Sequence, residues 1–142
     1  ALNQAPDLFD GAVLKVPFVD VVNSMSDSEL PLTAQQYGEW GNPNIADELK
    51  VMQQYDPYLN LSEQNYPPIL IQVGLNDSRV PYWEGAKYYA KLSELTTGSG
   101  PYLLSTNFTQ GHSTDRRQSL AQQAFEYAFL LSLTLKDIKA EQ

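Results

Sequence analysis

The feature that most constrains the fold of this chain is a short apolar segment that ends in a polar turn. Residues 69–73 read Ile-Leu-Ile-Gln-Val, and residues 74–77 follow at once as Gly-Leu-Asn-Asp. A short run rich in β-branched residues and bounded by turn residues is typical of a strand buried on both faces of a parallel sheet. Parallel strands need long crossover connections, so this segment favours an α/β fold.

Apolar segments on either side of this strand extend the pattern. Residues 11–22 (Gly-Ala-Val-Leu-Lys-Val-Pro-Phe-Val-Asp-Val-Val) predict a second buried strand, and Pro17 limits its pairing and marks its end. Residues 101–107 predict a third strand. Between the first two lie a long excursion over residues 23–45, with at most a short helix, and a short helix over residues 46–55.

Helical spacing predicts two further helices. The first begins after Asp77, carries Trp83, Ala86 and Ala90 on one face, and stops at residues 98–100 (Gly-Ser-Gly). The last carries a stripe of small and apolar side chains formed by Leu120, Ala121, Ala124, Phe125, Ala128 and Leu131. Because strands alternate with helices, we expect a mostly parallel sheet flanked by helices in a three-layer α/β architecture.

Composition excludes several classes of function. The chain has 17 Asp and Glu against 9 Lys and Arg, for a formal charge of −8, so a nucleic-acid partner is not expected. It has no cysteine, which removes disulfides, thiolate metal sites and a cysteine nucleophile. No apolar run approaches the roughly 20 residues that cross a bilayer. Metal-ligand spacing is also missing, so we expect no membrane span, no metal and no cofactor.

Two ionisable residues fall where α/β proteins place their sites, just after strands. Asp77 follows the strand over residues 69–73, and His112, the one histidine, follows the strand over residues 101–107. The order acid before histidine matches the α/β-hydrolases, in which a carboxylate orients an imidazole that accepts a proton from serine. An Asp in a turn more often bonds its own backbone, and a loop His more often lies at the surface. On spacing alone the two interpretations stand about level.

A nucleophile is missing from the pattern. No Gly-x-Ser-x-Gly occurs, and Ser99 leads from a helix into a strand, whereas the nucleophile elbow joins a strand to a helix. We therefore expect Ser99 to be a linker residue.

Five sequence blocks carry a resemblance over nearly the whole chain. They are residues 16–22, residues 39–43 (Glu-Trp-Gly-Asn-Pro), residues 66–70 (Tyr-Pro-Pro-Ile-Leu), residues 74–80 (Gly-Leu-Asn-Asp-Ser-Arg-Val) and Gly111-His112. In this order they resemble the oligopeptidase B (protease II) branch of the prolyl oligopeptidase family of serine peptidases. The resemblance implies that residues 1–142 are the C-terminal half of an α/β-hydrolase domain, without its nucleophile elbow and without a β-propeller. The serine is expected shortly before Ala1.

The resemblance also assigns roles. It implies that Asp77 and His112 are the acid and base of a triad acting on short peptides, in the cytoplasm or alternatively the periplasm. Arg79 matches an arginine that bonds the substrate backbone, and Phe18 matches a residue lining the pocket for the scissile side chain. Their structural alternatives are an ion pair for Arg79 and an ordinary core aromatic for Phe18.

One departure concerns specificity. Gln36 and Gly38 stand where the resemblance places two glutamates that pair with a basic substrate side chain. Since a neutral amide lacks the charge-assisted gain, we expect Gln36 to bind substrate with a relaxed or altered preference.

Other functions stay open. A related α/β-hydrolase (an acylaminoacyl peptidase, a dipeptidyl peptidase or an esterase) shares the triad, and an inactive structural fragment is the non-enzymatic alternative. We expect the isolated chain to lack peptidase activity, and its exposed sheet edge to favour a homodimer or a strand-exchanged assembly.

Overall fold

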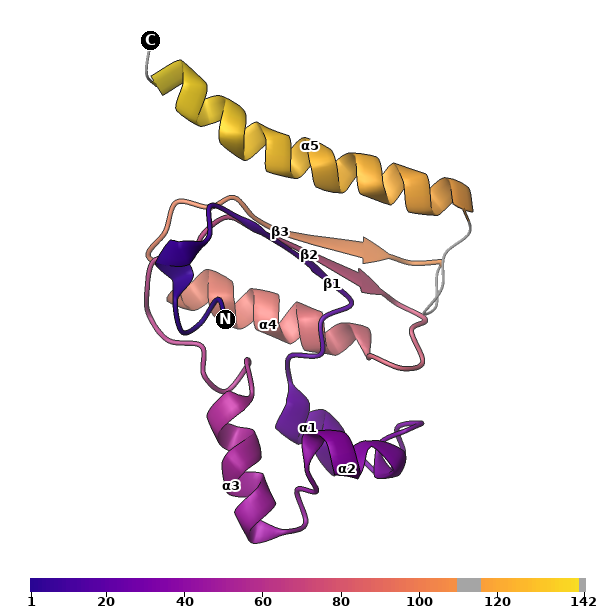
Figure 1. Cartoon of the computed structure of the whole chain (residues 1–142). Helices are drawn as coiled ribbons and strands as arrows, with labels where there is room; N and C mark the ends of the chain where they lie inside the picture. The colour runs from indigo at the N-terminus through magenta and orange to yellow at the C-terminus, as the bar shows by residue number, and fades with distance from the viewer. Residues whose placement is uncertain (110–115, 141–142) are drawn as a thin grey trace.

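The computed structural model describes the backbone of residues 1–109 and 116–140 and the side chains of residues 1–109 and 119–135. Three strands, β1 (Ala12–Lys15), β2 (Ile69–Gly74) and β3 (Tyr102–Asn107), form a parallel sheet in the order β1-β2-β3. Helix α4 (Tyr82–Leu95) covers one face of the sheet and α5 (Arg116–Ala140) the other (Figure 1). The predicted three-layer α/β architecture is confirmed.

The central strand β2 organises the core. All six of its residues are buried, and it pairs with β1 from Ala12 opposite Ile69 and with β3 up to Gly74 opposite Asn107. Ile69, Ile71 and Val73, which share one face of β2, join the main core cluster, to which α4 contributes Tyr88 and Leu92. The strand predicted over residues 69–73 is therefore confirmed, because an apolar run of this length is buried from both sides.

The strand predicted in the apolar run of residues 11–22 ends close to Pro17, as expected, and the apolar residues beyond it are not part of a strand. β1 ends at Lys15, Val16 has a φ of 44°, and after Pro17 the chain enters helix α1 (Val21–Ser26). The left-handed backbone at Val16 and the missing N–H at Pro17 both end strand pairing. The apolar residues that follow are buried in a helix instead of a strand.

Beside α4 lies a group of short helices (Figure 1). Beyond α1 it contains the 3-10 helix η2 (Ala34–Gln36), α2 (Tyr37–Trp40) and α3 (Ala46–Tyr55), and a 3-10 helix η1 (Pro6–Leu8) lies near the N-terminus. The helix predicted over residues 46–55 is confirmed. A second core cluster of Val21, Met25 and Met52 holds the group together.

The buried face of α4 differs from the predicted one. Trp83 is 42% exposed and Ala90 is also exposed, so the predicted stripe of Trp83, Ala86 and Ala90 is wrong in phase. The face that meets the sheet carries Glu84, Gly85, Tyr88 and Leu92. A Cβ atom on Gly85 would lie 2.5 Å from Cγ1 of Val73, so the glycine lets the helix approach β2 closely.

The stripe predicted on the last helix is likewise not its sheet-facing side. The stripe residues Leu120, Ala121, Ala124, Phe125, Ala128 and Leu131 are all exposed. The side toward the sheet carries Glu126, which pairs with Lys15 of β1 at 2.9 Å, and the buried Phe129. Pattern alone assigned the wrong face because the sheet-facing side of α5 includes a charged residue, which forms an ion pair with the sheet.

Candidate active site

The segments that follow β2 and β3 leave the sheet side by side. The N–H of Leu75 donates to the carbonyl oxygen of Asn107 at 2.8 Å, and the side-chain amide of Asn76 donates to the carbonyl oxygen of Phe108 at 3.4 Å. Asp77 is buried at this carboxyl end of the sheet. His112 lies outside the described residues, a few positions beyond Phe108.

The carboxylate of Asp77 organises the turn into α4. Its Oδ1 accepts hydrogen bonds from the N–H groups of Arg79 at 2.8 Å and Val80 at 3.0 Å. The turn role considered for this residue is thus present. A carboxylate has two oxygens and room for several donors, so a turn role and a bond to an imidazole are compatible.

A hollow of about 240 Å³ brings together all three predicted substrate-binding residues. Its lining consists of Phe18, Leu32, Gln36, Trp40, Arg79 and Val80. The ring of Phe18 meets that of Trp40 edge to face at 5.0 Å, and both rings also pack against the cluster around Met25. Phe18 therefore serves as a core aromatic and as a wall of the hollow at once.

Among the lining residues that the structure describes, none is acidic. Gln36 is half-buried and Arg79 is exposed, so the one formal charge on this described lining is positive. A Cβ atom on Gly38 would meet nothing within 4 Å, which leaves open space where the resemblance places a glutamate. A basic side chain would find no carboxylate partner on these walls.

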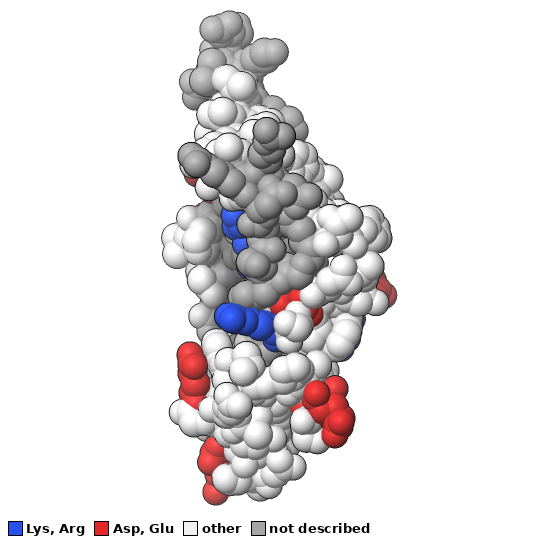
Figure 2. Space-filling model, turned by 90° about the vertical axis from the view of Figure 1, so that its right-hand side faces the viewer, with Lys and Arg blue, Asp and Glu red and all other residues white. Residues whose placement is uncertain are grey.

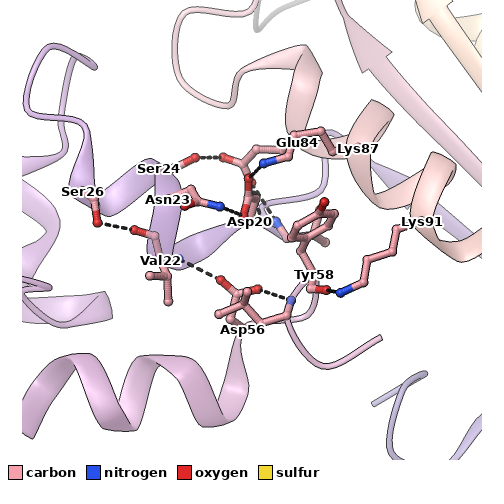
Figure 3. A network of polar contacts seen from close by, with 12 residues as sticks. Asp20, Val22, Asn23, Ser24, Ser26, Asp56, Tyr58, Glu84, Lys87 and Lys91 are labelled. Atoms are coloured by element: carbon pink, nitrogen blue, oxygen red, sulfur yellow. Dashed lines mark hydrogen bonds and ion pairs between the residues drawn. The ribbon is translucent and has the colours of Figure 1, made fainter. Parts of the chain in front are cut away.

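A buried polar network joins α1 to α4 (Figure 3). Glu84 is fully buried; its Oε2 accepts from the N–H groups of Val19 at 2.8 Å and Asp20 at 3.1 Å, and its Oε1 accepts from the hydroxyl of Ser24 at 2.5 Å. Burial raises the pKa of Glu84 above its usual value, and these hydrogen bonds oppose the rise. Sequence reasoning missed Glu84. The signal was a helical spacing of Pro81, Gly85, Tyr88 and Leu92 with Glu84 on the same face.

The network continues through a second acid. Asp20, which is buried, pairs with Lys87 one turn along α4, and the hydrogen bond to Asp20 raises the pKa of Lys87. The ammonium groups of Lys87 and Lys91 lie 4.6 Å and 4.7 Å from the centre of the Tyr58 ring. Asp56, also buried, accepts from the N–H of Val22 at 2.8 Å. These contacts fix α1 against α4 and against the segment that follows α3.

The surface at this end of the sheet has no continuous basic area in its described part. Figure 2 shows Lys and Arg side chains near the middle of the face and Asp and Glu side chains at separate places around it.

In the described ranges, no group of three His, Asp or Glu side chains is arranged to hold a metal ion. No helix there has the length and apolarity to cross a membrane. Ser99 lies in the link between α4 and β3, as predicted.

Comparison with known proteins agrees with the geometry. Residues 1–136 match the model of the prolyl oligopeptidase family. The chain is 42% identical over 131 residues to dipeptidyl aminopeptidase BI of Pseudoxanthomonas mexicana, covering 91% of this chain and 18% of the relative. It is 40% identical over 131 residues to protease 2 of Moraxella lacunata, covering 91% and 19%.

Solved structures give the same result. Oligopeptidase B from Trypanosoma brucei, with covalently bound antipain, superposes with a TM-score of 0.90 at 46% identity and covers 94% of this chain and 19% of that one. The chain thus spans about a fifth of the length of these relatives. The predicted resemblance to oligopeptidase B and the α/β-hydrolase fold are confirmed. The chain belongs to the prolyl oligopeptidase family of peptidases.

Proposed function

We propose that this chain supplies the acid, the base and the side-chain pocket of a serine peptidase that cleaves short peptides. The observation that carries the proposal is the link between Asp77 and the hollow. The same carboxylate that would orient a histidine holds Arg79 and Val80 in place, and both residues line the hollow that also contains Phe18 and Gln36. A catalytic acid and a substrate pocket are therefore joined in one structural unit.

In the proposed reaction, Asp77 bonds one ring nitrogen of His112 and leaves the other as a base. His112 takes the proton of the serine hydroxyl as the serine oxygen attacks the scissile carbonyl, and later gives it to the leaving amine. In the second half of the reaction the imidazole takes a proton from water as the water oxygen attacks the acyl-serine, and it gives that proton to the serine oxygen as the acid product leaves. The chain contains no elbow sequence, so the proposal assigns the serine to a part of the protein that precedes residue 1, together with a propeller domain.

The hollow favours a neutral scissile side chain. Gln36 can donate and accept hydrogen bonds without a charge, and the aromatic rings of Phe18 and Trp40 offer apolar contact. Arg79 disfavours a second positive charge nearby. We infer a preference for uncharged side chains over Arg and Lys.

The test uses a panel of short peptides with the complete protein that carries this sequence. The proposal expects cleavage that a fluorophosphonate abolishes, and it expects residues 1–142 alone to be neither labelled nor active. Fluorophosphonate labelling of residues 1–142 alone, or a complete protein that cleaves no peptide, would overturn the proposal.

A dipeptidyl aminopeptidase is the second candidate, because a relative of that name is 42% identical over 91% of the chain. Peptides with a blocked N-terminal amine separate the two. An oligopeptidase cleaves them, whereas an enzyme that needs a free amine does not.

Assembly and compartment complete the proposal. Within the described residues, β1 pairs with β2 on one side, and an edge of this kind invites another strand. We infer that residues 1–142 alone form a dimer or strand-exchanged assembly, which light scattering tests against a monomer. The resemblance to oligopeptidase B favours the cytoplasm, with the periplasm as the alternative, and cell fractionation distinguishes them.

A further inference from the structure

We propose that Glu84 is a positioning residue that sets the shape of the candidate substrate hollow by joining its two walls. One wall carries Phe18, just before α1, and the other carries Arg79 and Val80, just before α4. The inference rests on the proposed function in that it treats the hollow as the pocket for the scissile side chain.

The contacts of Glu84 support this role. From the first turn of α4 its carboxylate reaches the N–H groups of Val19 and Asp20, which lie 65 and 64 positions away in the sequence and directly follow Phe18. The other oxygen accepts from Ser24, one turn into α1. A single side chain thus bonds the backbone beside one wall and belongs to the helix that begins beside the other.

The chemistry of the site favours a function beyond packing. A fully buried carboxylate is costly to desolvate, and a leucine of similar volume would fill the same space without that cost. What leucine cannot do is accept the three hydrogen bonds that fix the chain where β1 turns into α1. That turn contains the left-handed Val16 and Pro17 and lies outside any strand or helix, so its backbone is held by the bonds of Glu84 and by the N–H of Tyr58, which donates to the carbonyl oxygen of Val19 at 2.7 Å.

The pair of Asp20 and Lys87 does not replace this link. The ion pair joins side chains, and Lys87 is 40% exposed, whereas Glu84 bonds the backbone and is sealed from solvent. Loss of the Glu84 acceptors would leave α1 attached through Asp20 and Asp56 but would remove the bonds between α4 and the backbone that directly follows Phe18, so the spacing of Phe18 and Val80 would change.

The experiment measures pocket selectivity in the complete protein. For two peptides that differ only in a leucine or a glycine at the scissile position, the ratio of kcat/KM reports the fit of the hollow. Glu84→Leu should lower this ratio about tenfold or more, since pocket contacts are worth that much discrimination. Glu84→Gln should keep the ratio within about threefold, because the amide oxygen accepts from both N–H groups and the Ser24 hydroxyl can turn to accept from the amide.

A matched control separates shape from stability. Leu92→Val lies on α4, is fully buried and is remote from the hollow, so it should lower the melting temperature and leave the selectivity ratio unchanged. If Glu84→Leu does not fold, Glu84→Asp takes its place, since it keeps the charge but is one methylene too short. An unchanged ratio in the folded variant, or an equal fall in Leu92→Val, would overturn the proposal.

A second readout does not depend on activity. In residues 1–142 alone with Trp83→Phe, Trp40 is the one remaining tryptophan, and it touches Phe18 at a wall of the hollow. Glu84→Leu should shift its emission and raise its quenching by acrylamide at least about twofold, and Glu84→Gln should not. If the complete protein cleaves no peptide, the proposed function fails and this measurement alone decides the role of Glu84. Unchanged quenching in Glu84→Leu would overturn that role.

Discussion

Gly74 at the end of β2 lies opposite Asn107 at the end of β3 in a parallel register. The two strands therefore deliver the segments that follow them to the same edge of the sheet, where a backbone contact and an amide contact already join them. Asp77 belongs to the first segment and His112 follows the second. This shared edge is the structural basis for testing the two residues as a pair.

The first prediction concerns Asp77→Asn. Asparagine keeps the side-chain oxygen that accepts from Arg79 and Val80, so the turn and the stability should change little. The charge that, in the proposed triad, orients and stabilises His112 is lost. In the complete protein kcat/KM should fall by about 10⁴, the effect of this change in a serine triad, and a steady-state peptide assay measures it.

Its control is Asp77→Ala, which also removes the turn acceptor and should lower the melting temperature in addition. An Asp77→Asn protein that keeps activity within about tenfold of the parent would show that the carboxylate serves the turn alone.

The second prediction concerns two substitutions that add negative charge to the hollow. Gln36→Glu combined with Gly38→Glu should raise kcat/KM for peptides with Arg or Lys at the scissile position by about tenfold or more, since a charge-assisted bond adds roughly 1 kcal/mol or more. Open space beside Gly38 admits the new side chain. Gln35→Glu, an exposed neighbour that does not line the hollow, is the matched control and should change little. If Gln35→Glu raised kcat/KM for these basic peptides as much as the double variant does, the gain would come from general surface charge and not from the hollow.

The third prediction concerns the pH dependence of stability. Burial raises the pKa of Glu84 in the folded chain above its ordinary value of 4.5, so above pH 4.5 the folded state holds a proton that the unfolded state has released. The contribution of Glu84 to stability therefore falls as pH rises through this window and levels off above the folded pKa. Glu84→Gln has no such proton to lose.

Urea unfolding at a series of pH values from 4.5 upward measures this difference. The free energy of unfolding of Glu84→Gln, minus that of the parent chain, should increase with pH across the window. A constant difference would show that Glu84 ionises equally in the folded and unfolded chains.

The fourth prediction concerns the link between α4 and β3. A Cβ atom on Gly98 would lie 2.5 Å from Oδ1 of Asn65 and 2.6 Å from the carbonyl oxygen of Tyr66 and would also strike the Tyr102 hydroxyl. Gly98→Ala should therefore lower the free energy of unfolding by about 1–3 kcal/mol, as overpacking does. Gly38→Ala is the control, because its methyl group meets nothing and should be neutral or slightly stabilising. Equal stability of the two variants would refute the crowding argument.

The strands and helices were predictable where local pattern and burial agree. Residues 69–73 are buried on both sides and read as a strand, and residues 46–55 form the predicted helix. The hydrophobic pattern predicted the wrong structure where tertiary contacts determine whether a segment is a strand or a helix. The Val-Val pair at residues 21–22 favours a strand locally but forms a helix whose preceding N–H groups are bonded by Glu84. On α4 and α5 the face toward the sheet carries a charged residue, Glu84 and Glu126 respectively, so the apolar spacing indicated the wrong face of each helix.

The sequence predicted which residues line the candidate site better than it predicted the contacts that hold them in place. The resemblance named Phe18, Gln36 and Arg79, and these residues do line one hollow. Spacing identified Asp77 but could not indicate that its carboxylate also shapes the turn. Glu84 was missed because a glutamate in the first turn of a helix is ordinarily read as a solvated residue near the positive end of the helix dipole.

The open space beside Gly38 has a consequence for how members of this family diversify. Positions 36 and 38 lie on short helices that take no part in the hydrogen bonds of Glu84, Asp20 or Asp56. If the hollow takes the scissile side chain as proposed, a substitution there would change the walls without removing any of these hydrogen bonds. One or two mutations would then suffice to alter the proposed preference at little cost in folding stability.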